Sequence, residues 1–324
     1  MVHLIKDIKS NLTIYHTAIA GGAAGAVTRA VAQPLDVLKI RFQLQLEPIQ
    51  KGSKYSSILQ ATTSIVKEEG IFALWSGHIP AQYLSITFGI LQFSTFEKLT
   101  HLFQRTDPQY YTVHKHWINF VNGAVAAAVA TVASYPFDTV RTRLIAEQKK
   151  NKAYKGFVDA SAMMIRHEGF RSLFKGIIPT LGQIAPNAGI QFAVYKFFTN
   201  SILNKVQYFQ RKEINVFSTI ETSLLGNLLA GSIAGSVAKT VIYPFDLVKK
   251  RLQIQGFQKH RSGFGRQMYC RGVFHCVRLT VTEEGMLALY KGYWPSMLKA
   301  VLTSALHFAA YDEIKSLLLR IQGW

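Results

Sequence analysis

Cysteine is nearly absent from this chain, which has two among its 324 residues, Cys270 and Cys276. They stand six positions apart in a polar stretch, and this number and spacing match neither a disulfide framework nor a set of metal ligands. We therefore expect two ordinary thiols, no disulfide and no metal site.

The N-terminal stretch lacks the features of a targeting signal. Its first 15 residues include Lys6, Asp7 and Lys9, with neither a secretory apolar core nor the Arg- and Ser-rich pattern of a transit peptide. If the protein enters an organelle, we expect its targeting signal to lie within the sequence rather than at the N-terminus.

Acidic residues are scarce, with 18 Asp and Glu against 37 Lys and Arg, which gives a net charge of +19. Such a balance suggests an anionic partner, either nucleic acid or a charged surface. A DNA-binding protein would cluster its basic residues on soluble domains, whereas here they gather at the ends of long apolar runs and inside several of them. With 49% hydrophobic residues, the chain is better interpreted as a membrane bundle than as two soluble domains, and we expect no nucleic-acid partner.

Enzyme-like constellations are also missing. The sequence offers no paired carboxylates, no metal-ligand cluster and no nucleophile with a base nearby. Gly21-Gly22 stands inside an apolar run rather than after a strand, so it does not form a phosphate-binding loop. A polytopic membrane enzyme is therefore the less favoured class, and we expect no cofactor.

The chain does contain an octapeptide that occurs three times, with the pattern Pro-x-Asp-x-x-basic-x-Arg. A second signature, Glu-Gly followed by aromatic-x-Gly with a basic residue at x in two copies, comes after each. Self-similarity at a fixed period determines the architecture before other reasoning begins. We predict three repeats of about 100 residues, 1–108, 109–212 and 213–324, that form one structural unit. The octapeptides occupy 34–41, 136–143 and 244–251, and the second signatures 69–77, 168–176 and 284–292.

Each repeat has two segments long enough to cross a bilayer, which takes about 20 apolar residues. Between them lies a short stretch whose apolar positions recur at helical spacing and which stops at Glu-Gly. We predict that these amphipathic helices lie along the membrane surface at 56–69, 157–168 and 273–284. The predicted spans are 15–44, 78–103, 115–146, 177–204, 220–253 and 293–319.

Charged residues inside the predicted spans need partners, because each costs roughly 2.5–3.5 kcal/mol there. Asp36 and Lys39 share a helix face just beyond Pro34, which kinks the span. One acid and one base per repeat suit a closed ring between neighbouring repeats. The alternative is an ion pair within each helix.

These motifs resemble the mitochondrial carrier family, and the resemblance covers nearly the whole chain. It implies an all-α membrane protein with six transmembrane helices in a pseudo-threefold bundle, with short amphipathic helices on the matrix side. It also implies the mitochondrial inner membrane, one central substrate site, and a gate on each side that opens alternately. We expect a monomer.

By that resemblance the motif ring is the matrix gate. Matching by position implies three ion pairs and glutamine braces nine residues after the motif proline, at Gln43 and Gln253; Ile145 replaces the third brace. The implied pairs are Asp36–Arg141, Asp138–Lys249 and Asp246–Lys39.

The gate on the other side matches the family less well. Its pattern is aromatic-acidic-x-x-basic, and only Asp312 with Lys315 fits in full. Glu97 has Thr100 where the base should be, and Lys196 replaces the acid in the fourth span. A complete cytoplasmic ring is therefore not expected.

The substrate site can be located partly from helix geometry. Residues seven positions before each motif Asp share its face, about 10 Å away, and these are Arg29, Thr131 and Lys239. Buried cations with few acids nearby require an anionic substrate, and a phosphate group fits this requirement. For Lys299 the alternative is that its side chain extends to the membrane interface. Nucleotides and coenzyme A compounds are among the possible substrates. Family contact positions add Gln183 and Lys299, and a polar layer in register adds Gln92, Gln191 and His307.

The second signature implies a lipid partner. By the resemblance, Lys175-Gly176 and Lys291-Gly292 would bind cardiolipin, with helix N-termini offering N–H groups to its phosphates. Ser76 replaces the basic residue in the first repeat.

Overall fold

The computed structural model describes residues 2–46, 54–147, 153–210, 216–257 and 268–321. All regular secondary structure within these ranges is helical. Side chains are described within 21–46, 54–147, 153–199, 230–257 and most of 268–316, but not at 307, 308, 311, 312 or 315. The fold is all-α, as the sequence predicts.

Each repeat has the same order of elements: a long helix with the motif proline, a short helix, a 3₁₀ turn, and a second long span. The first repeat has α1 (Val2–Leu44), α2 (Ile58–Glu69), η1 (Ile71–Trp75) and α3 (His78–Thr106). The second has α4 (Pro108–Ala146), α5 (Phe157–Glu168), η3 (Phe170–Phe174), α6 (Ile177–Gly182) and α7 (Ile184–Gln210). The third has α8 (Val216–Gln253), α9 (Val273–Glu284), η5 (Met286–Tyr290) and α10 (Tyr293–Ile321).

One predicted span differs, because the fourth is divided into α6 and α7 at Gln183. Pro186 has no backbone N–H, so the carbonyl of Gly182 loses its helical donor. The N–H of Gln183 still makes the helical bond to the carbonyl of Pro179, and it also bonds to that of Leu181. The break lies beside a predicted substrate residue, which the sequence interpretation as one continuous span did not anticipate.

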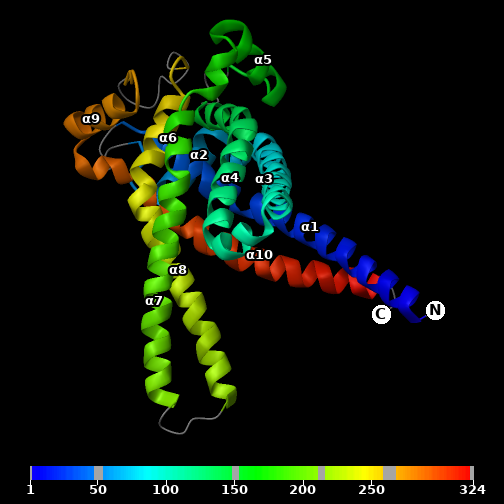
Figure 1. Ribbon diagram of the computed structural model, residues 1–324. Coiled ribbons are helices and arrows are strands. Elements are labelled where there is room, and N and C mark those ends of the chain that lie inside the picture. Colours follow the sequence, from blue (N-terminus) through cyan, green and yellow to red (C-terminus); the bar gives the residue numbers. More distant parts are fainter. Residues whose placement is uncertain (1, 47–53, 148–152, 211–215, 258–267, 322–324) are drawn as a thin grey trace.

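The long helices pack in three pairs: α1 with α10, α3 with α4, and α7 with α8. The pairs diverge from the end of the molecule that carries the short helices (Figure 1). Each pair joins helices from two different repeats. The bundle is therefore closed at the short-helix end and splayed at the other.

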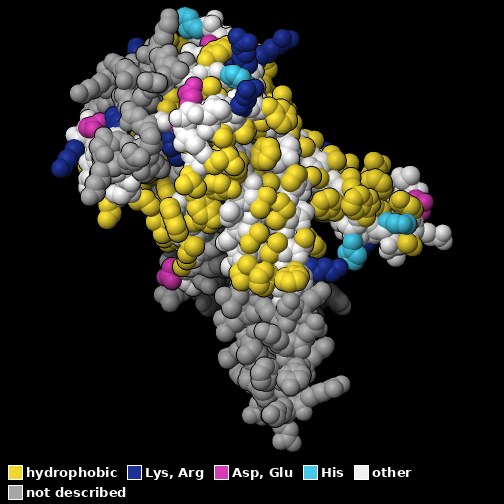
Figure 2. Space-filling model, turned by 90° about the vertical axis from the view of Figure 1, so that its left-hand side faces the viewer, with side chains coloured by type: hydrophobic (Ala, Val, Ile, Leu, Met, Phe, Trp, Pro, Cys, Tyr) yellow, Lys and Arg dark blue, Asp and Glu magenta, His cyan; other side chains and the backbone are white. Residues whose placement is uncertain are grey.

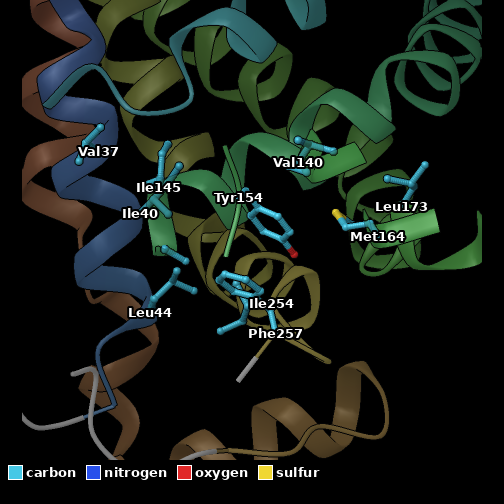
Figure 3. Close-up of a cluster of buried hydrophobic side chains, with 12 residues drawn as sticks. Val37, Ile40, Leu44, Val140, Ile145, Tyr154, Met164, Leu173, Ile254 and Phe257 are labelled. Atoms are coloured by element: carbon cyan, nitrogen blue, oxygen red, sulfur yellow. The ribbon is translucent and has the colours of Figure 1, made fainter. Parts of the chain in front are cut away.

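The hydrophobic core lies at the closed end. The largest buried cluster joins the C-terminal ends of α1 and α4 and the residues that follow α8 with α5 and η3 (Figure 3). Two smaller clusters lie beneath α2 and α9. The large cluster contains Val37, Ile40, Leu44, Val140, Ile145, Ala146, Tyr154, Ala160, Met164, Leu173, Ile254 and Phe257.

The helix surfaces away from this core are apolar, as a lipid-facing bundle requires. Figure 2 shows hydrophobic side chains along the helices and basic side chains mainly near the short-helix end. Judged by length and composition, one helix within the described ranges, α4, is apolar enough to cross a membrane, with a mean hydropathy of 1.4. Lys239 and Asp246 interrupt the described part of α8.

The residue before each motif proline connects the two signatures of its repeat. Tyr135 and Tyr243 donate hydrogen bonds from their hydroxyls to the carbonyls of Lys175 and Lys291. Gln33 does the same with its side-chain amide to the carbonyl of Ser76. Each odd span is thus fixed to the start of the even span in its own repeat.

The signature glycines fix one repeat to the next. Gly292 has φ +80°, and a Cβ there would lie 2.8 Å from the carbonyl oxygen of Lys39. Gly176 has φ +85°, and its Cβ would lie 3.0 Å from the carbonyl oxygen of Lys249. Any side chain would therefore strain the backbone and push the neighbouring odd span away.

Candidate substrate site and gates

Three ion pairs link the three proline-containing helices into a closed triangle. Each pair joins two different helices, α1 with α4, α1 with α8, and α4 with α8, so the within-helix alternative is wrong. All three pairs implied by position are present. They are Arg141–Asp36 at 2.5 Å, Lys39–Asp246 at 3.2 Å and Lys249–Asp138 at 2.9 Å.

The Asp138 corner has a second cation that the sequence analysis missed. Lys250 Nζ lies 2.9 Å from Asp138 Oδ1 and donates to Thr142 Oγ1 at 2.8 Å. The signal was visible, because the third octapeptide has Lys250 where the first has Ile40 and the second Thr142. This corner is therefore bonded more extensively than the other two.

The Asp36 corner also has a second cation, one that was predicted as a substrate residue. Lys299 Nζ on α10 lies 2.6 Å from Asp36 Oδ1, while Arg141 holds Oδ2. The ring thus extends to an even span, and one side chain belongs to both the gate and the predicted substrate position.

The two predicted braces lie at different distances from the ion pairs. Gln253 fits the prediction, since its Nε2 donates to Asp138 Oδ2 at 2.8 Å and its Oε1 accepts from Lys250. Gln43 instead donates to the Tyr243 hydroxyl at 3.1 Å, and its buried Oε1 has no partner among the described residues. In this state Gln43 braces a tyrosine rather than an ion pair.

A brace of another kind supports the Asp36 corner. Gln33 Oε1 accepts from Arg141 Nη2 at 3.3 Å. Ile145, which occupies the missing brace position, is fully buried in the large hydrophobic cluster. The Asp36 corner is therefore braced by the side-chain amide of Gln33, the residue before the motif proline.

A second set of three ion pairs lies below the ring and was also missed. The last arginine of each octapeptide forms a two-pronged bond with the glutamate of the following Glu-Gly, and these arginines are 0–2% exposed. Each arginine also donates to a backbone carbonyl near the end of the next odd span. Both members recur in register in the sequence, so they could have been found. The pairs are Arg41–Glu69, Arg143–Glu168 and Arg251–Glu284.

The predicted lipid lysines point into this second set instead of outward. Lys175 Nζ lies 2.7 Å from Glu168 Oε2 and donates to the Gln255 carbonyl. Lys291, which is 4% exposed, pairs with Glu284 and donates to the carbonyls of Gln45 and Leu46. The ammonium group of Lys291 is thus closed to a lipid, whereas the Lys175 side chain, although paired, remains 35% exposed.

The charge around Glu168 changes its acidity. Burial alone would raise the pKa of this carboxyl, but hydrogen bonds and charge from Arg143 and Lys175 lower its pKa below the ordinary value. Glu168 therefore remains ionised and holds both cations.

A cavity of about 820 Å³ opens above the ring between α3, α4, α6, α7 and α8. Its lining includes Asp138, Asp246 and Lys249, so the ring of ion pairs borders this cavity. The predicted substrate residues that line it are Gln92, Thr131, Gln183, Gln191 and Lys239.

A second cavity, of about 540 Å³, lies between α1 and α10. It is lined by Arg29 and Lys299, with Asp36 at its base. Lys239 in the larger cavity is near enough to Lys299 for the two charges to interact. The predicted cations therefore line two cavities, Lys239 the larger one and Arg29 with Lys299 the smaller one.

Neither Arg29 nor Lys239 has a carboxylate partner within the described ranges. Arg29 Nη1 donates to the carbonyl of Ala81 at 3.0 Å, and Lys239 Nζ to that of Ser296 at 2.8 Å. Both leave other donors available. The cavity walls thus carry two cations that form no ion pair with the carboxylates of the described residues.

The neutral residues of the larger cavity differ in what they offer. Gln183, at the α6–α7 break, has a buried Oε1 without a hydrogen-bond partner among the described residues. Thr131 donates its hydroxyl proton to Ala127, one turn earlier on its own helix. Gln92 is partly exposed and Gln191 exposed along the wall.

The predicted cytoplasmic gate is described only in part. Glu97 lies 3.8 Å from His101, one turn along α3, and both side chains are exposed. This contact is within a helix and does not close a gate. The side chains of His307, Asp312 and Lys315 lie outside the described residues.

Comparison with known proteins gives the class first. The pattern of the mitochondrial carrier protein family matches residues 10–107, 113–206 and 221–322. The chain belongs to this family of transporters, and it is a multi-pass protein of the mitochondrial inner membrane.

Individual relatives are similar over nearly their whole length. The chain is 41% identical over 305 residues to the mitochondrial thiamine pyrophosphate carrier of Homo sapiens, which covers 93% of this chain and 92% of that protein. It is 42% identical over 301 residues to the Bos taurus protein of the same name, with 91% and 90% covered. It is 35% identical over 312 residues to mitochondrial thiamine diphosphate carrier 2 of Zea mays, with 92% of each covered.

Proposed function

We propose that this carrier imports thiamine pyrophosphate into the mitochondrial matrix in exchange for nucleotides, by alternating access. The observation that carries the proposal is the group of cations at the gate end of the cavities, Arg29, Lys239 and Lys299, of which Arg29 and Lys239 lack acidic partners in the described part of the chain. A diphosphate supplies the missing negative charge, and its oxygens accept charge-assisted hydrogen bonds. The larger cavity lies within the ~300–1,000 Å³ that small-molecule sites occupy.

Sequence similarity supports this substrate over others in the class. The relatives named above carry thiamine pyrophosphate or thiamine diphosphate in their names. Four stretches of this chain resemble the thiamine pyrophosphate carrier in particular: 36–45, 77–82, 249–253 with Gly256-Phe257, and 295–300. These stretches include Lys299 and the residues beside two gate corners.

Coupling between substrate and gate follows from Lys299. A phosphate that takes its ammonium group removes one of the two cations of Asp36. The ring is then weaker in the loaded carrier than in the empty one. A ligand changes a conformational equilibrium only by such a difference in contacts.

The polar positions Gln92 and Gln183 are left for the uncharged pyrimidine end of the substrate. The buried Oε1 of Gln183 is an acceptor that lacks a donor among the described residues, and an amino group would supply one. We propose that the substrate leaves unchanged, with no covalent bond made or broken and no cofactor taking part.

We also propose that cardiolipin binds at the short-helix end of a monomeric carrier. A groove of about 390 Å³ runs between the start of α2 and the start of α10, beside Ser57 and Gly292. Backbone N–H groups at helix N-termini attract phosphate, and Tyr293 and Trp294 supply apolar surface for acyl chains. At this groove the lipid contacts the backbone near Gly292, and at the equivalent place in the second repeat it contacts the backbone near Gly176. It does not bind through the lysines.

Uptake into liposomes that contain the purified protein tests the substrate. A panel of labelled thiamine pyrophosphate, thiamine monophosphate, thiamine, ATP and coenzyme A separates the alternatives, and the internal substrate is recovered for chemical identification. We expect saturable uptake of thiamine pyrophosphate that needs internal nucleotide. Preference for ATP or coenzyme A would assign the carrier to those substrates, and recovery of a converted product would point to an enzyme.

A further inference from the structure

The two cysteines occupy positions that are equivalent to buried residues in the other repeats. Cys270 stands two residues before the N-cap of α9, where the other repeats have Tyr55 and Tyr154. Cys276 stands at the fourth residue of α9, where they have Ala61 and Ala160. All six positions are buried. The third repeat thus has a thiol pair where the others have a tyrosine and an alanine.

The tyrosines have a partner that Cys270 does not replace. Arg41 Nη1 donates to the Tyr55 hydroxyl at 3.3 Å, and in the second repeat Arg143 lies close enough to Tyr154 for its charge to act on that hydroxyl. In the third repeat Arg251 turns instead to Thr280 Oγ1, at 2.8 Å. The side chain of Cys270 is too short for the arginine, so its sulfur faces another neighbour.

That neighbour is Cys276. Both thiols belong to one buried cluster with Val248 and Met268, and each is the neighbour that most changes the pKa of the other. Neither is in a disulfide. Two thiols that share one small buried cluster, six residues apart in one short segment, are the pair in which a disulfide can be sought.

The two sulfurs differ in reactivity. The neighbouring Cys276 thiol, aided by the charge of Arg251, holds the pKa of Cys270 below its ordinary value despite burial. The Cys270 thiol and burial raise the pKa of Cys276. Cys270 is also the more accessible, at 6% against 0% exposed. The thiolate is the attacking form, so Cys270 reacts first.

We propose that Cys270 and Cys276 form a reversible redox-modification site, which a small-molecule disulfide of the glutathione type oxidises to an intramolecular disulfide. The Cys270 thiolate attacks the small disulfide, forms a mixed disulfide and releases one small thiol. Cys276 then loses its proton and attacks the Cys270 sulfur, which releases the second small thiol. Two protein thiols are oxidised, and one small disulfide is reduced to two thiols.

The disulfide would tie the segment before α9 to its first turn. Glu284, which pairs with Arg251, lies at the other end of the same helix. The equivalent segments of the first two repeats have Tyr–Arg contacts at this place, and those contacts do not depend on redox state. Redox control is therefore confined to the third repeat.

The test uses the full chain in liposomes, equilibrated with mixtures of reduced and oxidised glutathione and then trapped with an alkylating reagent. Intact mass and peptide mapping should show a form that lacks two hydrogens, with Cys270 joined to Cys276. Its share should rise with oxidised glutathione and fall again with excess reduced glutathione. Full alkylation of both cysteines across the whole series, or a disulfide between two chains, would overturn the proposal.

Two variants separate the roles of the sulfurs. Cys276→Ala copies the residue of the other repeats, and we expect it to stop at a glutathione adduct on Cys270. Cys270→Ala should leave Cys276 unmodified in the folded carrier. Equal adduct formation on either cysteine in these variants would contradict the assigned order of attack. If a variant does not fold, the wild-type mass series still tests whether the disulfide forms.

Discussion

Lys299 and Asp36 are joined by a hydrogen-bonded ion pair of 2.6 Å between α10 and α1. Asp36 is at the same time a corner of the ring, through its pair with Arg141. Under the proposed function, a substrate anion would compete with Asp36 for this ammonium group, and loading of the site would weaken the ring.

Removing the cavity lysines should remove the recognition of phosphate. Lys239→Gln and Lys299→Gln should each weaken binding of thiamine pyrophosphate by roughly tenfold to a hundredfold, because a charge-assisted contact is worth about 1.5–3 kcal/mol. Competition by thiamine pyrophosphate, thiamine monophosphate and thiamine in the liposome assay measures the order of preference. Lys98→Gln, an exposed change on α3, is the control. Weaker transport with the order intact would move the phosphate site elsewhere.

Charge reversal tests the ring. Asp246→Lys should abolish exchange, because it places two cations together where α1 and α8 meet. Adding Lys39→Asp restores an opposite pair, and we expect part of the exchange rate to return. Initial uptake rates at matched protein levels make the comparison. A double variant no better than either single one would show that this contact is not a gate.

The extra cation at Asp138 should contribute to stability more than to recognition. Lys250→Thr, which copies Thr142 of the second repeat, removes three hydrogen bonds but leaves the Lys249 pair. We expect the free energy of unfolding to fall by about 1–3 kcal/mol, with substrate preference unchanged. Thermal unfolding in detergent and the competition assay provide the two measurements. Unchanged stability would mean that burial of Lys250 offsets what its bonds contribute.

Acid should loosen the second repeat at Glu168. Its pKa is lowered in the folded protein, so its ion pairs contribute fully above the ordinary value of 4.5 and are lost as the pH falls through the lowered value. The melting temperature of the wild type should decline over that acid range. Glu168→Gln should start lower at neutral pH and decline less. Parallel curves for the two proteins would exclude Glu168 as a source of the acid sensitivity.

Cardiolipin should raise the melting temperature without help from the signature lysines. Lys175→Ala with Lys291→Ala removes ion pairs to Glu168 and Glu284, so the lipid-free protein should melt earlier. The increment from added cardiolipin should remain, since both ammonium groups already bond to a glutamate and to backbone carbonyls. Ser57→Phe, which narrows the groove beside Gly292, should reduce the increment. Loss of the increment in the lysine variant would restore the lysines as lipid ligands.

Repetition made most of the fold and the ring predictable. Three copies of one motif gave the helix order, and matching Asp36 to Arg141 across repeats gave a pair that the structure contains. Pairs of the Arg41–Glu69 type also recur at equivalent positions of the three repeats, so the sequence contained the signal that predicts them.

Features that break the repetition could not be predicted in the same way. Lys299 reaches Asp36 because of how α10 packs on α1, and a spacing within one helix does not give that packing. Pro186 divides the fourth span, although the apolar pattern continues across it. The contact between Cys270 and Cys276 depends on a loop conformation that their spacing leaves open.

The packing of Gly292 on the backbone of Lys39 has a mechanical consequence. Lys299 lies seven residues further along α10, about 10 Å from that contact. Helix α10 is thus held to α1 at two points, at the main chain of Lys39 through Gly292 and at Asp36 through Lys299. Any movement of α10 relative to α1 therefore has to change at least one of these two contacts.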